Sequence, residues 1–152
     1  MKNICCLCIL LLSNFALANE GQLGIILGST TGLSGKFNLD AAHAVDGALS
    51  YSAYDKYGIN FHADYLVNKA RQFPVGGVNP LILYYGIGVR LINIRSGVDN
   101  GKSRIGVRTP IGLYHQINNP NLEIFGELAP VLDLTPGTDL SIDVGLGVRF
   151  RF

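Results

Sequence analysis

The last fifteen residues of the chain alternate between apolar and polar or small side chains without a break. The apolar set runs through Thr138, Leu140, Ile142, Val144, Leu146, Val148, Phe150 and Phe152. The other set is Asp139, Ser141, Asp143, Gly145, Gly147, Arg149 and Arg151. A period of two predicts an extended strand whose two faces meet different surroundings. The length of the apolar face favours a membrane strand, apolar outside and polar inside.

Similar alternation divides residues 19–152 into eight strand-like segments, separated by turns rich in Gly, Asn, Asp and Pro. The segments are 22–28, 33–39, 44–54, 58–67, 81–92, 103–115, 121–129 and 138–152. Eight is the strand number of the smallest outer-membrane barrels, whose interior is filled by side chains. We therefore expect an all-β fold, an eight-stranded antiparallel up-and-down transmembrane β-barrel. Pro110 and Pro130 cannot donate ladder hydrogen bonds, so a bulge or strand end is expected near each.

Along each of these segments, side chains alternate between two strand faces, and the charged residues occupy only one of the two sets of alternating positions, which we call one parity. They are Lys36, Asp46, Asp64, Arg90, Arg104, Arg108, Glu123, Glu127, Asp139, Asp143, Arg149 and Arg151. The opposite parity is aliphatic and aromatic. A soluble sandwich, or a soluble periplasmic lipocalin-like cup, would carry its charges outside. The equal numbers of acidic and basic groups predict an ion-paired lumen without an open pore, because an unpaired buried charge is costly. Phe125 departs from this polar-inside pattern.

The N-terminal segment, residues 1–18, has the layout of a cleaved secretory signal peptide. Lys2 precedes an apolar run over 4–12, and Ala16 and Ala18 form an A-x-A cleavage pattern. All three cysteines lie in this segment. We therefore expect an exported mature domain over 19–152 without a disulfide or a reactive thiol.

The composition is that of a hydrophobic chain, with 48% hydrophobic and 15% charged residues and a net charge of +1. After residue 18, no stretch approaches the ~20 consecutive apolar residues that a spanning helix requires. A nucleic-acid partner is not expected, since it would need a clustered basic surface.

Two short patterns resemble chemical motifs. The segment 28–36 (GSTTGLSGK) is similar to a phosphate-binding loop, but Thr30 and Phe37 stand where that motif needs Gly and Ser or Thr. We interpret it as a hairpin turn. His62 and Asp64 share a strand face and could begin a metal site, but no third His or Cys is evident. We therefore predict that His62 and Asp64 belong to a salt-bridge network.

Several stretches resemble a family of small, functionally uncharacterised bacterial outer-membrane-type β-barrel proteins. They are GQLGIILGSTTGLSGKF, INFHADYLV, LYYGIGVRL, RIGVRTPIGL and ELAPVLDLTPGTDLSIDVGLGVRF, which cover nearly all of residues 21–152. The family is similar in plan to OmpX and the OmpA transmembrane domain. This resemblance implies a fold and an outer-membrane location but no activity. The closing residues Leu146, Val148, Phe150 and Phe152 also resemble the C-terminal sorting signal read by the outer-membrane barrel assembly machinery.

The sequence thus predicts a monomeric, non-enzymatic outer-membrane protein with a structural or surface-interaction role. Its expected partners are outer-membrane lipids, the assembly machinery and periplasmic chaperones, with no cofactor or metal. One alternative is a lipid A-modifying enzyme that transfers or removes acyl chains. His115 is followed by Gln116 and Ile117, so the H-x-S spacing of the deacylases is missing. The other alternative is the soluble lipocalin-like binder.

Overall fold

The structure is a computed structural model that describes residues 21–51, 57–73, 79–95, 97 and 99–152. Ala16 and Ala18 lie outside this range, so signal cleavage stays a prediction. The described chain is all-β and forms nine strands. They are β1 (Gly21–Gly28), β2 (Gly32–Asn38), β3 (His43–Tyr51), β4 (Tyr57–Phe73), β5 (Leu81–Ile94), β6 (Ser103–Arg108), β7 (Ile111–Asn118), β8 (Asn121–Thr135) and β9 (Asp139–Arg151). No helix of the described residues is long and apolar enough to cross a membrane.

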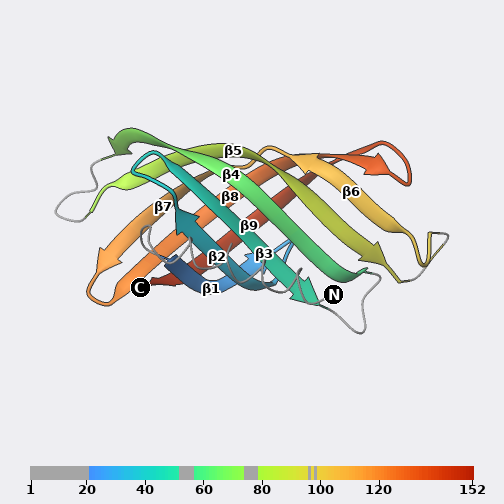
Figure 1. Cartoon of the computed structure of the whole chain (residues 1–152), viewed down its shortest axis with the longest axis horizontal. Coiled ribbons are helices and arrows are strands. Elements are labelled where there is room, and N and C mark those ends of the chain that lie inside the picture. The colour runs from blue at the N-terminus through green and yellow to red at the C-terminus, as the bar shows by residue number, and fades with distance from the viewer. Residues whose placement is uncertain (1–20, 52–56, 74–78, 96, 98) are drawn as a thin grey trace, which may run out of the picture.

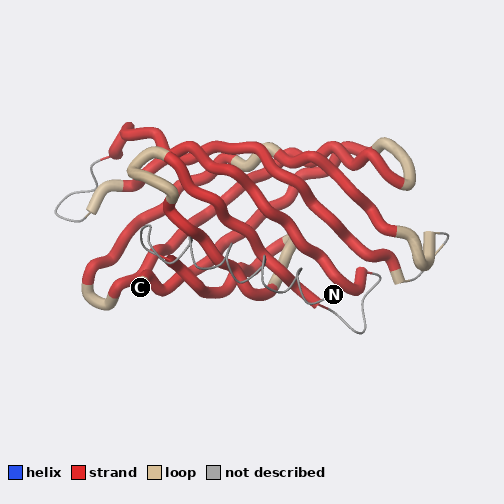
Figure 2. The backbone as a smooth tube through the Cα atoms, in the orientation of Figure 1, coloured by secondary structure: helices blue, strands red, loops and turns tan. Residues whose placement is uncertain are grey.

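The strands form one antiparallel sheet that closes into a ring. From β1 to β5 each strand pairs with the next along the chain, and β8 pairs with β9. The last strand returns to the first, since Gln22 to Gly28 of β1 pair with Arg151 to Gly145 of β9. Figure 1 shows the strands inclined to the long axis, and Figure 2 shows that short turns connect most of them. The ring therefore has two ends, and the C-terminus lies at the end that carries the β2–β3 and β7–β8 turns.

The expected eight strands are nine, because the predicted segment 103–115 is divided into β6 and β7. Both pieces lie between β5 and β8, and the register continues across the break. Pro110 stands at the break, as expected for a residue without a backbone N–H. Its carbonyl still accepts a 2.8 Å hydrogen bond from Gly86 N, which keeps β5 joined to this position. The two short strands therefore occupy one place in the ring.

Two other predicted segments were too short. The strand predicted to end at 129 continues through Pro130 to Thr135. Pro130 tolerates this position because it faces Thr109, at the break between β6 and β7, and its carbonyl accepts a 3.0 Å hydrogen bond from Thr109 N. The strand predicted over 58–67 continues to Phe73, with an irregularity between Lys69 and Gln72. This extension converts part of the long connection expected over 68–80 into strand.

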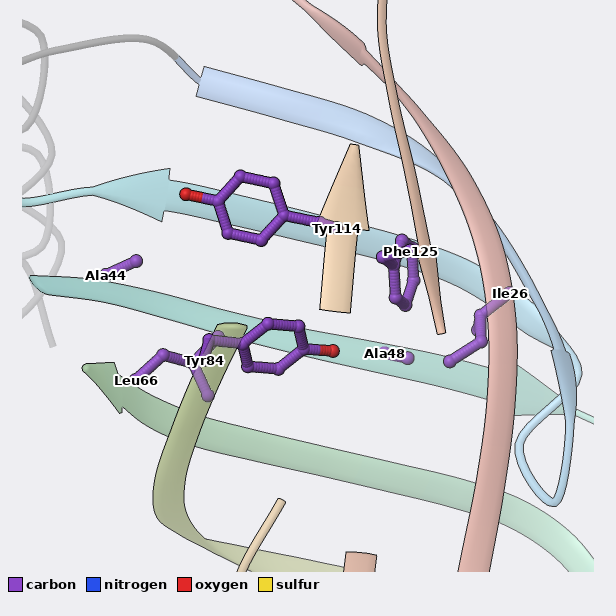
Figure 3. Packing of buried hydrophobic residues seen from close by; sticks show 7 residues of the cluster. All are labelled: Ile26, Ala44, Ala48, Leu66, Tyr84, Tyr114 and Phe125. Atoms are coloured by element: carbon purple, nitrogen blue, oxygen red, sulfur yellow. The ribbon is translucent and has the colours of Figure 1, made fainter. Parts of the chain in front are cut away.

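The interior of the ring is filled by side chains. Figure 3 shows its buried hydrophobic cluster, in which Tyr84, Tyr114 and Phe125 are the large members, beside Ile26, Ala44, Ala48 and Leu66. Glycines make room for some of these groups. A Cβ at Gly147 would lie 2.3 Å from the Phe125 ring, and a Cβ at Gly112 would lie 2.4 Å from the Tyr84 ring. Small and large residues therefore alternate around the interior, as a narrow ring requires.

Candidate functional site

The interior holds two groups of ion pairs. The first, which we call the balanced cluster, consists of Lys36, Asp46, Glu123 and Arg149. Lys36 Nζ lies 3.1 Å from Glu123 Oε2, and Arg149 bridges Asp46 at 2.7 Å and Glu123 at 3.4 Å. All four side chains are almost completely buried. Two cations face two carboxylates, so the cluster has no formal excess of charge.

The second group, the acidic cluster, consists of Asp64, Arg90, Arg104, Arg108, Glu127, Asp133 and Asp143. Arg90 pairs with Asp133 at 2.8 Å and with Asp143 at 2.6 Å. Arg108 contacts Glu127 closely and lies 3.3 Å from Asp64. The half-buried Arg104 completes the group at 3.4 Å from Asp133. Four carboxylates meet three guanidinium groups here, which leaves one negative charge in excess.

Aromatic rings cover part of these charges. The Arg149 guanidinium lies 3.8 Å from the centroid of the Phe125 ring, and Lys36 Nζ lies 3.9 Å from that of Tyr114. Tyr84 donates a 3.0 Å hydrogen bond from its hydroxyl to Glu127 Oε2. Phe125, the exception to the polar-inside pattern, is thus a cation–π partner of the interior charges.

The structure brings together ten of the twelve predicted lumen residues in these two clusters. Asp139 is not among them: it lies exposed at the start of β9. Arg151 is only half buried and donates to Ile117 O and Asn118 Oδ1 near the end of β7. The sequence reading missed Asp133, which is fully buried. Asp133 shares the parity of Glu123 and Glu127, so alternation indicates an inward position, but the predicted strand ends at 129 and excludes it.

The outer wall is apolar. Large hydrophobic side chains are exposed on every strand, and Leu146, Val148, Phe150 and Phe152 of the predicted sorting signal are all among them. Arg108, Asp143 and Arg149 are buried in the interior, whereas Val144 and Leu146 face outward. Among strand residues with a described side chain, the only ones that are both charged and exposed are Lys69 and Asp139. Both lie near strand ends, so the middle of the wall carries no exposed charge.

The interior is open at the end where the C-terminus lies. A cavity of about 400 Å³ is lined there by amide and carboxylate side chains and by Ile82 and Tyr114. At its rim, His43 Nδ1 lies 2.8 Å from Asp40 Oδ2. This side-chain hydrogen bond and the backbone N–H of Ala42 lower the pKa of the Asp40 carboxyl. The balanced cluster lies beyond Tyr114, which covers Lys36.

The structure shows where the two motif-like features of the sequence lie, the stretch 28–36 and the pair of His62 and Asp64. The glycine-rich stretch 28–36 spans the end of β1, the turn over 29–31 and most of β2, and Gly28 has a φ of +139°. It is a hairpin, not a loop that leads into a helix. His62 and Asp64 both point inward, and Glu127 of β8 joins them. Their ligand atoms lie within 4.8 Å of one another. The third residue of this group comes from a distant strand, which is why sequence spacing did not reveal it.

The chain was compared with protein-family models, curated proteins and solved structures, and nothing matches in any of the three.

Proposed function

We propose that this protein is a monomeric transmembrane β-barrel of a bacterial outer membrane, exported by a cleaved signal peptide. Its role is structural or one of surface interaction, without an enzymatic site or an open pore. The observation that carries the proposal is the inverted polarity of the ring. Ion pairs fill the interior, whereas aliphatic and aromatic groups cover the wall. In water this arrangement would expose a very large apolar surface, and soluble monomers rarely expose patches above a few hundred Å².

Aromatic residues at one end of the wall support this placement. Phe37, Tyr65, Tyr85, Phe150 and Phe152 are exposed near the end that holds the C-terminus. The Lys69 ammonium lies 6.0 Å from the Tyr85 ring centroid at the same end. Aromatic girdles and nearby basic groups are typical of a membrane–water interface. This end would face the periplasm.

The filled interior supports a closed core. Guanidinium groups, carboxylates and aromatic rings occupy its middle, and ion pairs join opposite walls of the ring. Arg149 of β9 reaches Asp46 of β3, and Arg90 of β5 reaches Asp143 of β9. An eight-position ring leaves just enough space for such side chains. A continuous water-filled channel is therefore not part of the proposal.

The opposite end supplies the exposed elements for a surface role. The β8–β9 hairpin extends past β1, because β1 ends at Gly28, opposite Gly145. Leu140 and Ile142 are 73% and 65% exposed on this extension. The β5–β6 connection adds a turn over 99–102 in which Lys102 N donates to Asp99 O at 3.0 Å and Gly101 has a φ of +82°. These two hairpins are the candidate recognition elements.

Membrane fractionation combined with a heat-modifiability gel tests the proposal. We expect the protein to remain in the washed outer-membrane fraction of a Gram-negative host and to migrate faster before heating than after it. Mass spectrometry of that material should give a chain that begins at Asn19. Recovery from a detergent-free periplasmic extract would instead support the soluble cup. Incubation with lipid A, followed by analysis of its acyl chains, addresses the enzyme alternative.

A further inference from the structure

A small cavity lies inside the ring, next to the acidic cluster. Its volume of about 10 Å³ is that of a single position for a water molecule or an ion. His62, Arg108, Glu127 and Asp143 line one part, and Ser29 and Thr30 from the β1–β2 turn line another. The turn residues place the cavity toward the end of the ring opposite the C-terminus.

Several buried polar atoms at this position have no hydrogen-bond partner. They are Thr30 Oγ1, His62 Nδ1, Asp64 Oδ1, Asp64 Oδ2 and Asp143 Oδ2. The two Oδ2 atoms face Arg108 as ion-pair partners, at 3.3 Å for Asp64 and 3.9 Å for Asp143, without a hydrogen bond. His62 and Asp64 are only 2% and 1% exposed, so solvent outside the ring does not satisfy them. Buried polar atoms without partners are rare and call for an explanation such as a bound water or ion. Thr30, His62 and Asp143 line the cavity, and the Asp64 carboxylate lies within 4.8 Å of ligand atoms of His62 and Glu127, so these atoms point to a ligand.

The charge of the surroundings identifies the kind of ligand. The balanced cluster pairs its cations and carboxylates equally, whereas the acidic cluster retains one negative charge. His62 lies beside the acidic cluster, and its ring is within reach of both Asp64 and Glu127. A water molecule would satisfy hydrogen bonds but would leave the charge unbalanced. A cation would coordinate the unpartnered nitrogen and oxygen atoms directly and would offset the excess negative charge; a divalent ion changes the formal charge of the cluster from −1 to +1.

We propose that His62, Asp64 and Glu127 bind one divalent transition-metal ion, with Zn²⁺ as the prototype. One imidazole nitrogen and two carboxylate oxygens form a donor set that suits Zn²⁺, whereas Ca²⁺ and Mg²⁺ prefer oxygen ligands alone. Glu127 accepts from Tyr84 and Arg108, but a carboxylate has about four lone-pair sites and keeps capacity for a metal. The ion would join β4 to β8 across the interior. This site exists whether or not the ring lies in a membrane.

The test is a metal titration of the folded protein as purified from the membrane, without a histidine tag; should residues 1–18 be retained, their cysteines are alkylated first. After chelation, we expect calorimetry to show one equivalent of Zn²⁺ and weaker or no binding of Ca²⁺ and Mg²⁺. Saturation with Zn²⁺ should raise the Tm, because the ion binds only the folded state. X-ray absorption of the complex should show imidazole and oxygen ligands without sulfur.

Variants then locate the site. His62→Gln and, independently, Asp64→Asn should each raise the Kd for Zn²⁺ by at least about tenfold, since even changes outside the ligand shell cost that much. A heat-modifiability gel establishes that each variant is folded before titration. The matched control replaces both other histidines (His43→Gln with His115→Gln) and should keep the wild-type Kd.

Three results would overturn the proposal. One is wild-type protein that takes up no Zn²⁺, which would mean that a protonated His62 or a water molecule satisfies the cluster. The second is unchanged binding in folded His62→Gln or Asp64→Asn. The third is loss of binding in the His43 and His115 control, which would place the ion on the surface. If neither interior variant folds, the absorption spectrum of the wild-type complex decides, since a spectrum without an imidazole ligand rejects the site.

Discussion

Arg149 donates a 2.7 Å hydrogen bond from its guanidinium group to Asp46 Oδ2, although β9 and β3 are not neighbours in the ring. The bond crosses the interior and joins residues 103 positions apart in the chain. Both side chains are buried, so neither charge has water as an alternative partner.

Removal of one partner should therefore cost more than removal of both. Arg149→Met leaves Asp46 unpaired and should lower the free energy of unfolding by about 3–5 kcal/mol. Asp46→Asn in the same chain should recover part of that loss, because Glu123 keeps its ion pair with Lys36. Urea unfolding in detergent, followed by heat-modifiable mobility, measures both. An equal loss of unfolding free energy in the single and double variants would mean that water hydrates the interior charges and that they are not energetically coupled.

Loss of the Asp133 charge should lower the free energy of unfolding more than loss of the Asp139 charge, although the sequence predicts Asp139 as the interior residue. Asp133→Asn weakens the pairs with Arg90 and Arg104 and should cost about 1–3 kcal/mol, the penalty for a buried group that loses a partner. Asp139→Asn lies on the surface and should stay within about 0.5 kcal/mol of wild type. The same unfolding measurement compares the two. A larger effect at Asp139 would contradict the assignment of the interior.

A charge on the outer wall separates a membrane protein from a soluble one. Val144 is 48% exposed, so Val144→Arg would be tolerated in water. In lipid the same change should lower the free energy of unfolding, by an amount that approaches roughly 2–4 kcal/mol the closer Val144 lies to the bilayer midplane. Thr138→Arg, on the same parity but next to the hairpin turn, is the matched control and should be nearly neutral. Folding into lipid vesicles measures both, and a neutral Val144→Arg would reject the proposed orientation.

The fit between Phe125 and Gly147 predicts an overpacking effect. Because a Cβ at Gly147 would lie 2.3 Å from the Phe125 ring, Gly147→Ala should cost about 1–3 kcal/mol. Phe125→Leu in the same chain should recover part of it by freeing space. Gly137→Ala, where nothing lies within 4 Å of the new Cβ, is the control and should have little effect. No difference between the two glycine variants would mean that the interior is loosely packed.

The closed interior predicts that the protein does not conduct ions. Reconstituted in a planar bilayer, the protein should give no steady ion current, because side chains from opposite walls meet across the ring. An open porin in the same bilayer serves as the positive control. Discrete single-channel currents from this protein would show that the charge clusters line a pore.

The sequence by itself determined which side chains face inward and which face outward. This follows from the period of two, a local property of the extended backbone, so the parity of Arg149, Asp143 and Val144 could be read without knowing any partner. Continuous parity also contained Asp133, and only the premature end placed at Pro130 concealed it. That error arose because the effect of a proline depends on the neighbouring strand. Pro130 is accommodated where it faces Thr109, at the break beside Pro110.

Only the tertiary structure decided which interior groups meet. The pairing of Arg149 with Asp46 depends on ring closure and on the register of strands far apart in the chain. The same holds for Glu127 beside His62 and Asp64, which the sequence separates by more than sixty positions. Alternation assigns a residue to a face of the sheet. Whether two side chains meet across the ring depends on the position along the ring axis and on the rotation of every strand between them. For this reason the interior could be predicted as charged, whereas its division into a balanced and an acidic cluster could not.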